Sequence, residues 1–175
     1  MAVSFFIRGI MNKNLYPTVY LSAFHDVTPE LLKKHGITGL LCDLDETLVG
    51  HNEQEINNEL ISWLEVLSEN DIPVCIISNN TQTRTSQFAR KIGVPYICMA
   101  MKPFAFKILR GADVINKPRD EVALVGDQLF TDVKAARNAG IKSILVDPMG
   151  NQSMWYVKMK RRREGKYKKE FKKEA

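Results

Sequence analysis

An apolar stretch, Ile37-Thr-Gly-Leu-Leu-Cys42, leads directly into Asp43-Leu-Asp-Glu-Thr47, which sets two carboxylates and a hydroxyl at alternate positions. The apolar stretch is typical of a buried strand, and successive side chains of a strand point to opposite faces. Asp43 and Asp45 are therefore expected on one side, where like charges can coexist only if a cation sits between them. A divalent metal ion would serve, so the stretch predicts a strand that carries acidic groups to its own end.

Outward from this strand, apolar runs and amphipathic stretches alternate along the chain. Four more short apolar runs predict strands at residues 73–77, 96–99, 122–125 and 144–146. Helical spacing and capping signals predict helices at residues 28–35, 54–69, 81–92, 104–112 and 133–139, and the first thirty residues otherwise read as irregular. Such alternation predicts an α/β fold, a three-layer, doubly wound, mainly parallel Rossmann-like sheet.

Polar side chains follow three of the predicted strands. Asp43 and Asp45 end the first, Ser78 and Asn79 follow the second along the chain, and Asp127 follows the fourth. In doubly wound sheets, ligands bind beyond the carboxyl ends of the strands. We therefore expect these residues to share one site.

Four segments occur in an order that points to a family, namely Asp43-Leu-Asp-Glu-Thr47, Ser78, Lys102 and Gly126-Asp-Gln-Leu-Phe-Thr-Asp132. In this order they resemble the motifs of the haloacid dehalogenase-like (HAD) phosphohydrolases over residues 37–147. Ile77-Ser-Asn-Asn80, Ala100-Met-Lys-Pro103 and the lead-in Asp26-Val-Thr-Pro-Glu30 further resemble the YqeG group of subclass IIIA. That group is related to a mitochondrial phosphatidylglycerophosphate phosphatase.

The resemblance implies a Mg²⁺-dependent phosphomonoesterase. Asp43 would be the nucleophile that forms an aspartyl-phosphate, because a metal and positive side chains can offset its repulsion from a phosphate dianion. Asp45 would protonate the leaving oxygen and later accept a proton from water. Mg²⁺, which prefers oxygen ligands, would be bound by one carboxylate oxygen of Asp43, by the backbone carbonyl of Asp45 and by Asp127.

The remaining motif residues would bind and position the phosphoryl group. Ser78 and the backbone amide of Asn79 would donate hydrogen bonds to its oxygens, and Lys102 would balance their charge. Thr47 would orient the Asp43 loop. Taken singly, Ser78 is also an ordinary strand-end hydroxyl and Lys102 an ordinary surface lysine. Asp132 is open to two interpretations, a helix cap or a brace for Lys102 or a metal-bound water.

Two further expectations concern residues beside these motifs. Glu46 stands where the YqeG group commonly has Asn, and we expect it to point into the mouth of the site and to influence substrate preference. Met99 and Met101 are interpreted as core residues.

The spacing of the motifs leaves no room for a cap domain. One helix accounts for the chain between Asp43 and Ser78, and one helix and one strand account for Ser78 to Lys102. We therefore expect an open site that cannot enclose a small metabolite. It suits a phosphate carried on something large, such as a lipid head group, a protein or a nucleic-acid end.

Charge is distributed unevenly along the 175 residues. Residues 158–175 hold ten Lys and Arg against three Glu, whereas residues 1–157 hold 15 basic against 17 acidic residues. A basic tail of this kind attracts anionic membranes and RNA with equal ease, and a solvated tail without a partner is the third interpretation. We expect an N-terminal segment at 1–27 on or near the core, a capless phosphatase domain at 28–150, and a basic helix or tail at 151–175.

The sequence favours a cytoplasmic protein, peripheral at most to the inner face of the membrane. It has no apolar run of transmembrane length and no basic leader before an apolar segment, and its three cysteines suggest no disulfide framework. Phosphatidylglycerophosphate is the favoured substrate. The alternatives are a phosphatase for a protein or a polynucleotide end, and an RNA- or ribosome-associated binding module with a vestigial site. The oligomeric state stays open.

Overall fold

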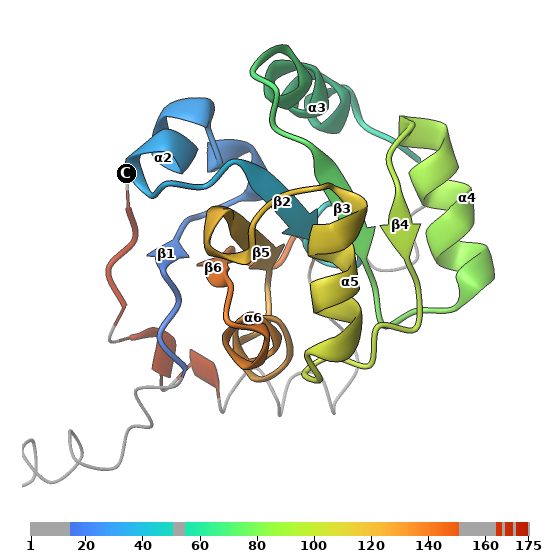
Figure 1. Cartoon of the computed structure of the whole chain (residues 1–175). Helices are drawn as coiled ribbons and strands as arrows, with labels where there is room; N and C mark the ends of the chain where they lie inside the picture. The colour runs from blue at the N-terminus through green and yellow to red at the C-terminus, as the bar shows by residue number, and fades with distance from the viewer. Residues whose placement is uncertain (1–14, 51–54, 151–163, 166, 170, 175) are drawn as a thin grey trace, which may run out of the picture.

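The computed structural model describes residues 15–50, 55–150, 164–165, 167–169 and 171–174. At its centre lies one six-stranded sheet whose paired strands all run parallel, in the order β1-β6-β5-β2-β3-β4. The strands are β1 Val19–Tyr20, β2 Gly39–Cys42, β3 Val74–Ile77, β4 Tyr96–Ile97, β5 Val122–Gly126 and β6 Lys142–Leu145 (Figure 1). The predicted α/β fold with a parallel sheet is confirmed.

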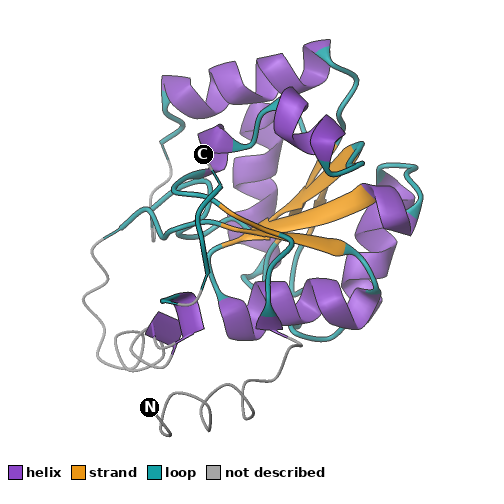
Figure 2. Ribbon diagram, turned by 90° about the vertical axis from the view of Figure 1, so that its left-hand side faces the viewer, coloured by secondary structure: helices purple, strands orange, loops and turns teal. Residues whose placement is uncertain are grey.

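Helices cover both faces of this sheet. They are α2 Pro29–Lys34, α3 Asn58–Glu69, α4 Gln82–Ile92, α5 Phe106–Val114 and α6 Lys134–Ala139, with short helical turns η2 Phe24–Asp26, η3 Arg119–Glu121 and η4 Leu129–Val133. Buried side chains of α2, α3 and α4 pack on one face, and those of α5 and α6 pack on the other. Figure 2 shows the strands running between these two layers. None of the helices in the described ranges has the length and apolarity of a membrane-spanning segment.

Strand β2 illustrates why the sheet is buried on both faces. Leu40 and Cys42 belong to the apolar cluster that contains α3, whereas Leu41 between them belongs to the cluster that contains α5. All four residues of the strand are buried. A continuous apolar run, rather than an alternating one, is what a strand between two helical layers requires.

The predicted helices and strands are found, with shifted ends. The helix expected from residue 54 begins at Asn58, because the Asn57 side chain caps it by accepting a hydrogen bond from the Leu60 amide at 2.8 Å. The strand expected over 96–99 ends at Ile97, because Met99 adopts a left-handed φ of 47°. The helix expected at 104–112 lies two residues later.

The expectation that the first thirty residues are irregular before the helix at 28–35 is wrong at β1. Val19 and Tyr20 pair with Ile144 and Leu145 and form one edge of the sheet. A strand of two residues is too short to produce a periodic pattern, so the sequence carries no signal for it. This edge strand adds a sixth strand to the five that the sequence predicts.

Part of the C-terminal tail lies against β1. The Glu174 amide donates to the Tyr20 carbonyl at 2.8 Å, and the Phe171 ring packs edge-on against Tyr16 with ring centroids 5.0 Å apart. Lys173 pairs with Asp147 at 2.6 Å. Residues 1–14 and the basic run 158–163 lie outside the described residues.

The described connections between the motifs contain only elements of the core. Between Asp43 and Ser78 the chain contributes a tight loop and α3, and between Ser78 and Lys102 it contributes α4 and β4. Within these described residues there is no separate cap domain.

Candidate active site

The two central strands bring Asp43 and Asp127 together. Cys42 of β2 pairs with Val125 of β5, and the Asp43 amide continues this pairing by donating to the Val125 carbonyl at 2.9 Å. Asp127 follows the end of β5, and the buried Thr47 donates to its carboxylate at 3.4 Å. One oxygen each from Asp43, Asp127 and Asp132 lies within 4.8 Å of the others. The three carboxylates thus form one buried acidic cluster.

Lys102 inserts its ammonium between two members of this acidic cluster. Its Nζ lies 2.5 Å from Asp43 Oδ1 and 2.6 Å from Asp132 Oδ1, and its side chain is only 2% exposed. The backbone of Lys102 is held from across the site, because the Asn79 side chain accepts from its amide at 2.7 Å and donates to its carbonyl at 3.2 Å. The ordinary surface-lysine interpretation therefore does not apply.

The environment of Asp43 disfavours its ionised form. Burial together with Asp132 and Asp127 raises the pKa of Asp43 from 3.8 to about 7, although Lys102 acts in the opposite direction. Burial by itself lowers the pKa of Lys102, but Asp132 and Asp43 outweigh this and raise it above its usual value. Lys102 is therefore a permanent cation, and its attraction for Asp43 does not fully offset the burial of that carboxylate.

Asp132 braces Lys102 and does not cap the helix that follows it, because Val133 occupies the N-cap position of α6 and no side chain caps that helix. One carboxylate oxygen pairs with Lys102, and the other accepts from the Gln128 amide at 3.0 Å, which closes the turn that enters η4. Gly126 makes this approach possible, since a Cβ there would lie 2.4 Å from Asp132. Asp132 therefore braces the lysine and stabilises its own turn.

Ser78 and Asn79 lie at the end of β3, beside the acidic cluster. Ser78 is 2% exposed, and its Oγ accepts from the Asn80 amide at 3.0 Å. The Ser78 carbonyl accepts from Ala100 at 2.9 Å, which ties the end of β3 to the segment that carries Lys102. The structure thus gathers the predicted site residues at the carboxyl ends of the strands: Asp43, Thr47, Ser78, Asn79, Lys102, Asp127 and Asp132.

Asp45 has partners that the sequence analysis did not single out. Its two carboxylate oxygens contact Arg84 Nη2 at 2.8 Å and Asn80 Nδ2 at 3.1 Å. Its carboxylate therefore lies toward α4 rather than toward Lys102. Asn80 belongs to the Ile77–Asn80 motif and could have been included on that ground. Arg84 could not, because one arginine on an amphipathic helix normally faces solvent.

One of two expectations about neighbouring residues is wrong, and the other stays a prediction. Glu46 adopts a left-handed φ of 67° and is 5% exposed, and its carboxylate packs against Gly150, where a Cβ would lie 2.7 Å from Oε2. Its effect on substrate preference stays a prediction. Met99 and Met101 are each 58% exposed and so are not core residues.

The donor set of the acidic cluster fits a hard divalent cation. The converging atoms of Asp43, Asp127 and Asp132 are all carboxylate oxygens, the ligand type that Mg²⁺ prefers, and no thiol or imidazole belongs to the group. The raised pKa of Asp43 also shows that positive charge would be favourable there.

Comparisons with known proteins agree with this geometry. The sequence model of a family described as mitochondrial PGP phosphatase matches residues 2–150. Probable phosphatase YqeG of Bacillus subtilis is 31% identical over 155 residues, which cover 89% of this chain and 90% of the relative.

Two solved structures share the fold. A hypothetical protein from Xanthomonas campestris superposes with a TM-score of 0.54 at 17% identity, covering 79% of this chain and 78% of that one. An uncharacterized protein from Listeria monocytogenes gives 0.53 at 17% identity, covering 67% and 85%. At this identity the likeness concerns the fold alone.

Proposed function

Because this chain belongs to the mitochondrial PGP phosphatase family, within the HAD hydrolases, we propose that it removes the terminal phosphate of phosphatidylglycerophosphate. The chain is a phosphatase, a phosphoric monoester hydrolase. The observation that carries the proposed reaction is the salt bridge of Lys102 with Asp43 and Asp132 at the carboxyl end of the central strands.

Asp43 is the proposed nucleophile. Lys102 holds its Oδ1, which leaves the second oxygen to attack phosphorus and form an aspartyl-phosphate. The Lys102 ammonium then lies against the charge that develops on the phosphoryl oxygens. Ser78 and the Asn79 amide are proposed as further donors to those oxygens, and the Ser78 hydroxyl can donate its proton because it is the oxygen that accepts from the Asn80 amide.

Asp45 is the proposed general acid and base. In the structure Arg84 and Asn80 hold its carboxylate beside the cluster, two residues from the nucleophile. The proposal requires this carboxyl to give a proton to the leaving alkoxide and to take one from the water that hydrolyses the aspartyl-phosphate. Thr47, by donating to Asp127, keeps the nucleophile loop in register with β5.

Asp43, Asp127 and the backbone carbonyl of Asp45 are the proposed ligands of Mg²⁺, and Asp132 adds a nearby carboxylate. When bound, Mg²⁺ would neutralise the phosphate and the nucleophile and so lower the repulsion between them. The raised pKa of Asp43, which burial and the neighbouring carboxylates Asp132 and Asp127 produce, supports this assignment.

The proposed organisation follows from the same contacts. The proposed catalytic domain is residues 28–150, with an N-terminal segment at 1–27, of which the described Val19 and Tyr20 pair with β6, and a basic tail at 151–175. The proposed location is the cytoplasmic side of a membrane. The absence of a separate cap domain in the described connections between the motifs supports a substrate displayed on a large body.

A comparison of substrates tests the proposal. The full chain is incubated with Mg²⁺ and phosphatidylglycerophosphate, a phosphopeptide or a 3′-phosphorylated oligonucleotide, and released phosphate is measured. We expect the lipid to be turned over fastest and Asp43→Asn to abolish every activity. Faster turnover of the peptide or the oligonucleotide would replace the lipid by that substrate. Activity that persists in Asp43→Asn, or no activity in the wild type, would refute the proposed chemistry, and the latter would favour an RNA-binding module.

A further inference from the structure

The connection from β4 to α5 exposes large apolar side chains. Met99 and Met101 are 58% exposed, Phe104 is 69% exposed and Phe106 is 72% exposed. These four residues, called the apolar rim below, lie within eight positions of one another. Apolar side chains that gather on a connecting segment, rather than singly over the surface, mark an interaction site.

The apolar rim and the site share one segment of chain. Ala100 and Lys102 point inward and are buried, whereas Met99 and Met101 alternate with them and point outward. Left-handed φ values of 47° at Met99 and 54° at Met101 produce this outward projection. Because Lys102 is anchored to Asp43 and Asn79, the apolar rim is held next to the carboxyl ends of strands β3 and β4 (Figure 1).

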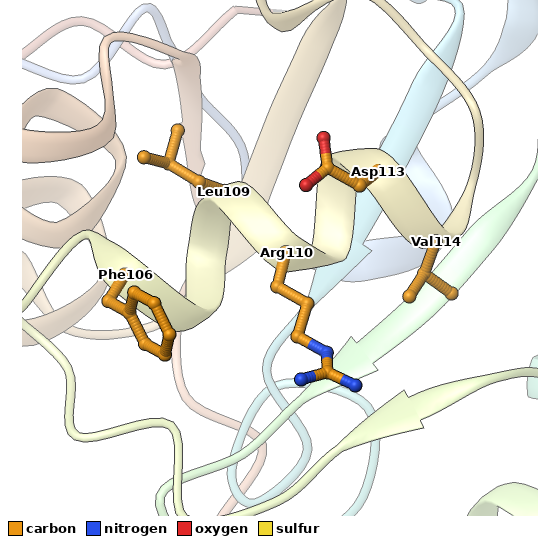
Figure 3. Close-up of a pocket in the computed structure, with 5 residues that line it drawn as sticks. All are labelled: Phe106, Leu109, Arg110, Asp113 and Val114. Atoms are coloured by element: carbon orange, nitrogen blue, oxygen red, sulfur yellow. The ribbon is translucent and has the colours of Figure 1, made fainter.

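The two helices next to the apolar rim carry exposed basic side chains. Arg110 lies beside Phe106 in a hollow along the outer side of α5, together with Leu109, Asp113 and Val114 (Figure 3). Helix α6 is joined to the rim by a hydrogen bond from Asn138 to the Pro103 carbonyl at 2.8 Å, and it exposes Lys134 and Arg137. Asp113 is the only acidic residue of α5, and α6 has none.

We propose that the apolar rim inserts into the surface of a bilayer that contains anionic phospholipid, which places the Lys102 segment and the nucleophile beside lipid head groups. The combination of exposed Phe and Met with flanking Lys and Arg matches the apolar and anionic layers of such a surface. This inference rests on the proposed lipid substrate. It assigns membrane contact to residues 99–106, beside the nucleophile.

The described part of the basic tail fits this contact less well. Lys168 and Lys173 both pair with Asp147, at 3.7 Å and 2.6 Å, and the segment lies along β1, an edge strand of the sheet. Part of its charge is therefore already compensated. The apolar rim, in contrast, adjoins the Lys102 segment on both sides.

The test compares two double variants of the full chain. Phe104→Ser with Phe106→Ser removes the aromatic half of the apolar rim, and Ile61→Ser with Val66→Ser is the matched control, because those α3 side chains are 36% and 43% exposed. Flotation is measured with vesicles of phosphatidylcholine alone and of phosphatidylcholine mixed with phosphatidylglycerol. Turnover is measured on p-nitrophenyl phosphate and on phosphatidylglycerophosphate in the mixed vesicles.

We expect the wild type and the α3 control to float with the mixed vesicles. The rim variant should bind them about tenfold less, since it lacks the two aromatic rings that insert into the bilayer. Turnover of the vesicle substrate should fall in parallel, while hydrolysis of p-nitrophenyl phosphate stays unchanged. Equal flotation of all three proteins, or no flotation of the wild type, would overturn the inference. A rim variant that is monomeric beside an associated wild type would also overturn it, by assigning the rim to a contact between copies.

Two measurements keep the inference separate from the proposed function. Flotation needs no catalysis, so a protein that floats through its rim but does not hydrolyse the lipid refutes only the substrate. In Phe104→Trp, we expect the tryptophan emission to shift to shorter wavelength when mixed vesicles are added, beyond any change in the wild type. An unchanged emission would count against insertion even if the serine variant failed to fold.

Discussion

The unfavourable charge of the acidic cluster leads to a counterintuitive prediction for Asp43→Asn. A pKa raised from 3.8 to about 7 makes the ionised form of Asp43 about 4 kcal/mol less favourable in the folded protein than in water. Between these two pH values the unfolded chain has released a proton that the folded chain still holds, so stability falls as the pH rises and the penalty is complete above pH 7. Replacing the nucleophile by its neutral isostere should therefore stabilise the metal-free protein.

Thermal unfolding in a chelator at pH 8 and pH 5 measures this effect. If half of the penalty is recovered, the Tm rises by about 4–8 °C at pH 8, given about 2–4 °C per kcal/mol for a chain of this size. At pH 5 the gain should be less than half as large. Added Mg²⁺ should stabilise the wild type more than the variant, and Asp113→Asn on the exposed side of α5 should have no comparable effect. A lower Tm for Asp43→Asn at pH 8, or equal gains at both pH values, would refute the reasoning.

Three further changes test other parts of the structure. Lys102→Met should reduce kcat for p-nitrophenyl phosphate by at least about 100-fold, as loss of a preorganised charge partner does, and a smaller loss would remove the lysine from the proposed chemistry. Gly111→Val should destabilise the fold by about 1–3 kcal/mol in urea unfolding, because even a Cβ would lie 2.7 Å from the Ile77 side chain; an unchanged midpoint would contradict this packing. Although burial by itself raises the pKa of Asp147, hydrogen bonds from an ammonium and a phenol lower it below its usual value, so its stabilising effect is present at neutral pH and lost as the pH falls through the lowered pKa. Asp147→Asn should therefore cost less than about 1 kcal/mol at pH 7, because solvent screens the pair, and progressively less as the pH falls below 3.8 and through the lowered pKa; a pH-independent cost would exclude the ion pairs as its origin.

Most of the fold could be predicted because its strands are continuous apolar runs between two helical layers. The strand at Gly39–Cys42 and the helix ending at Gly93 carry strong local signals, a run of apolar residues and a left-handed glycine cap. Strand β1 carries none, since its two residues are defined only by pairing with β6. The ends of helices shifted where a side-chain cap such as Asn57 decided the first turn.

The site was predictable where residues follow strand ends and unpredictable where contacts come from helix surfaces. The carboxyl ends of parallel strands lie on the same side of the sheet. The positions of Asp43 and Asp127 directly after two such strands therefore indicated that they lie close together. The contact of Arg84 with Asp45 depends on how α4 packs, which no local pattern specifies. The buried position of Glu46 depends on a left-handed turn that the sequence did not signal, because glutamate rarely adopts it.

The position of β2 and β5 at the middle of the sheet has a consequence for how the enzyme loses activity on heating. Amide hydrogens in central strands generally exchange only when the whole domain opens. Since Asp43 and Asp127 extend from these two strands, no local fraying at the edges separates them. Thermal inactivation should accordingly coincide with the cooperative melting of the entire domain, and a partially active, partially melted form should not accumulate.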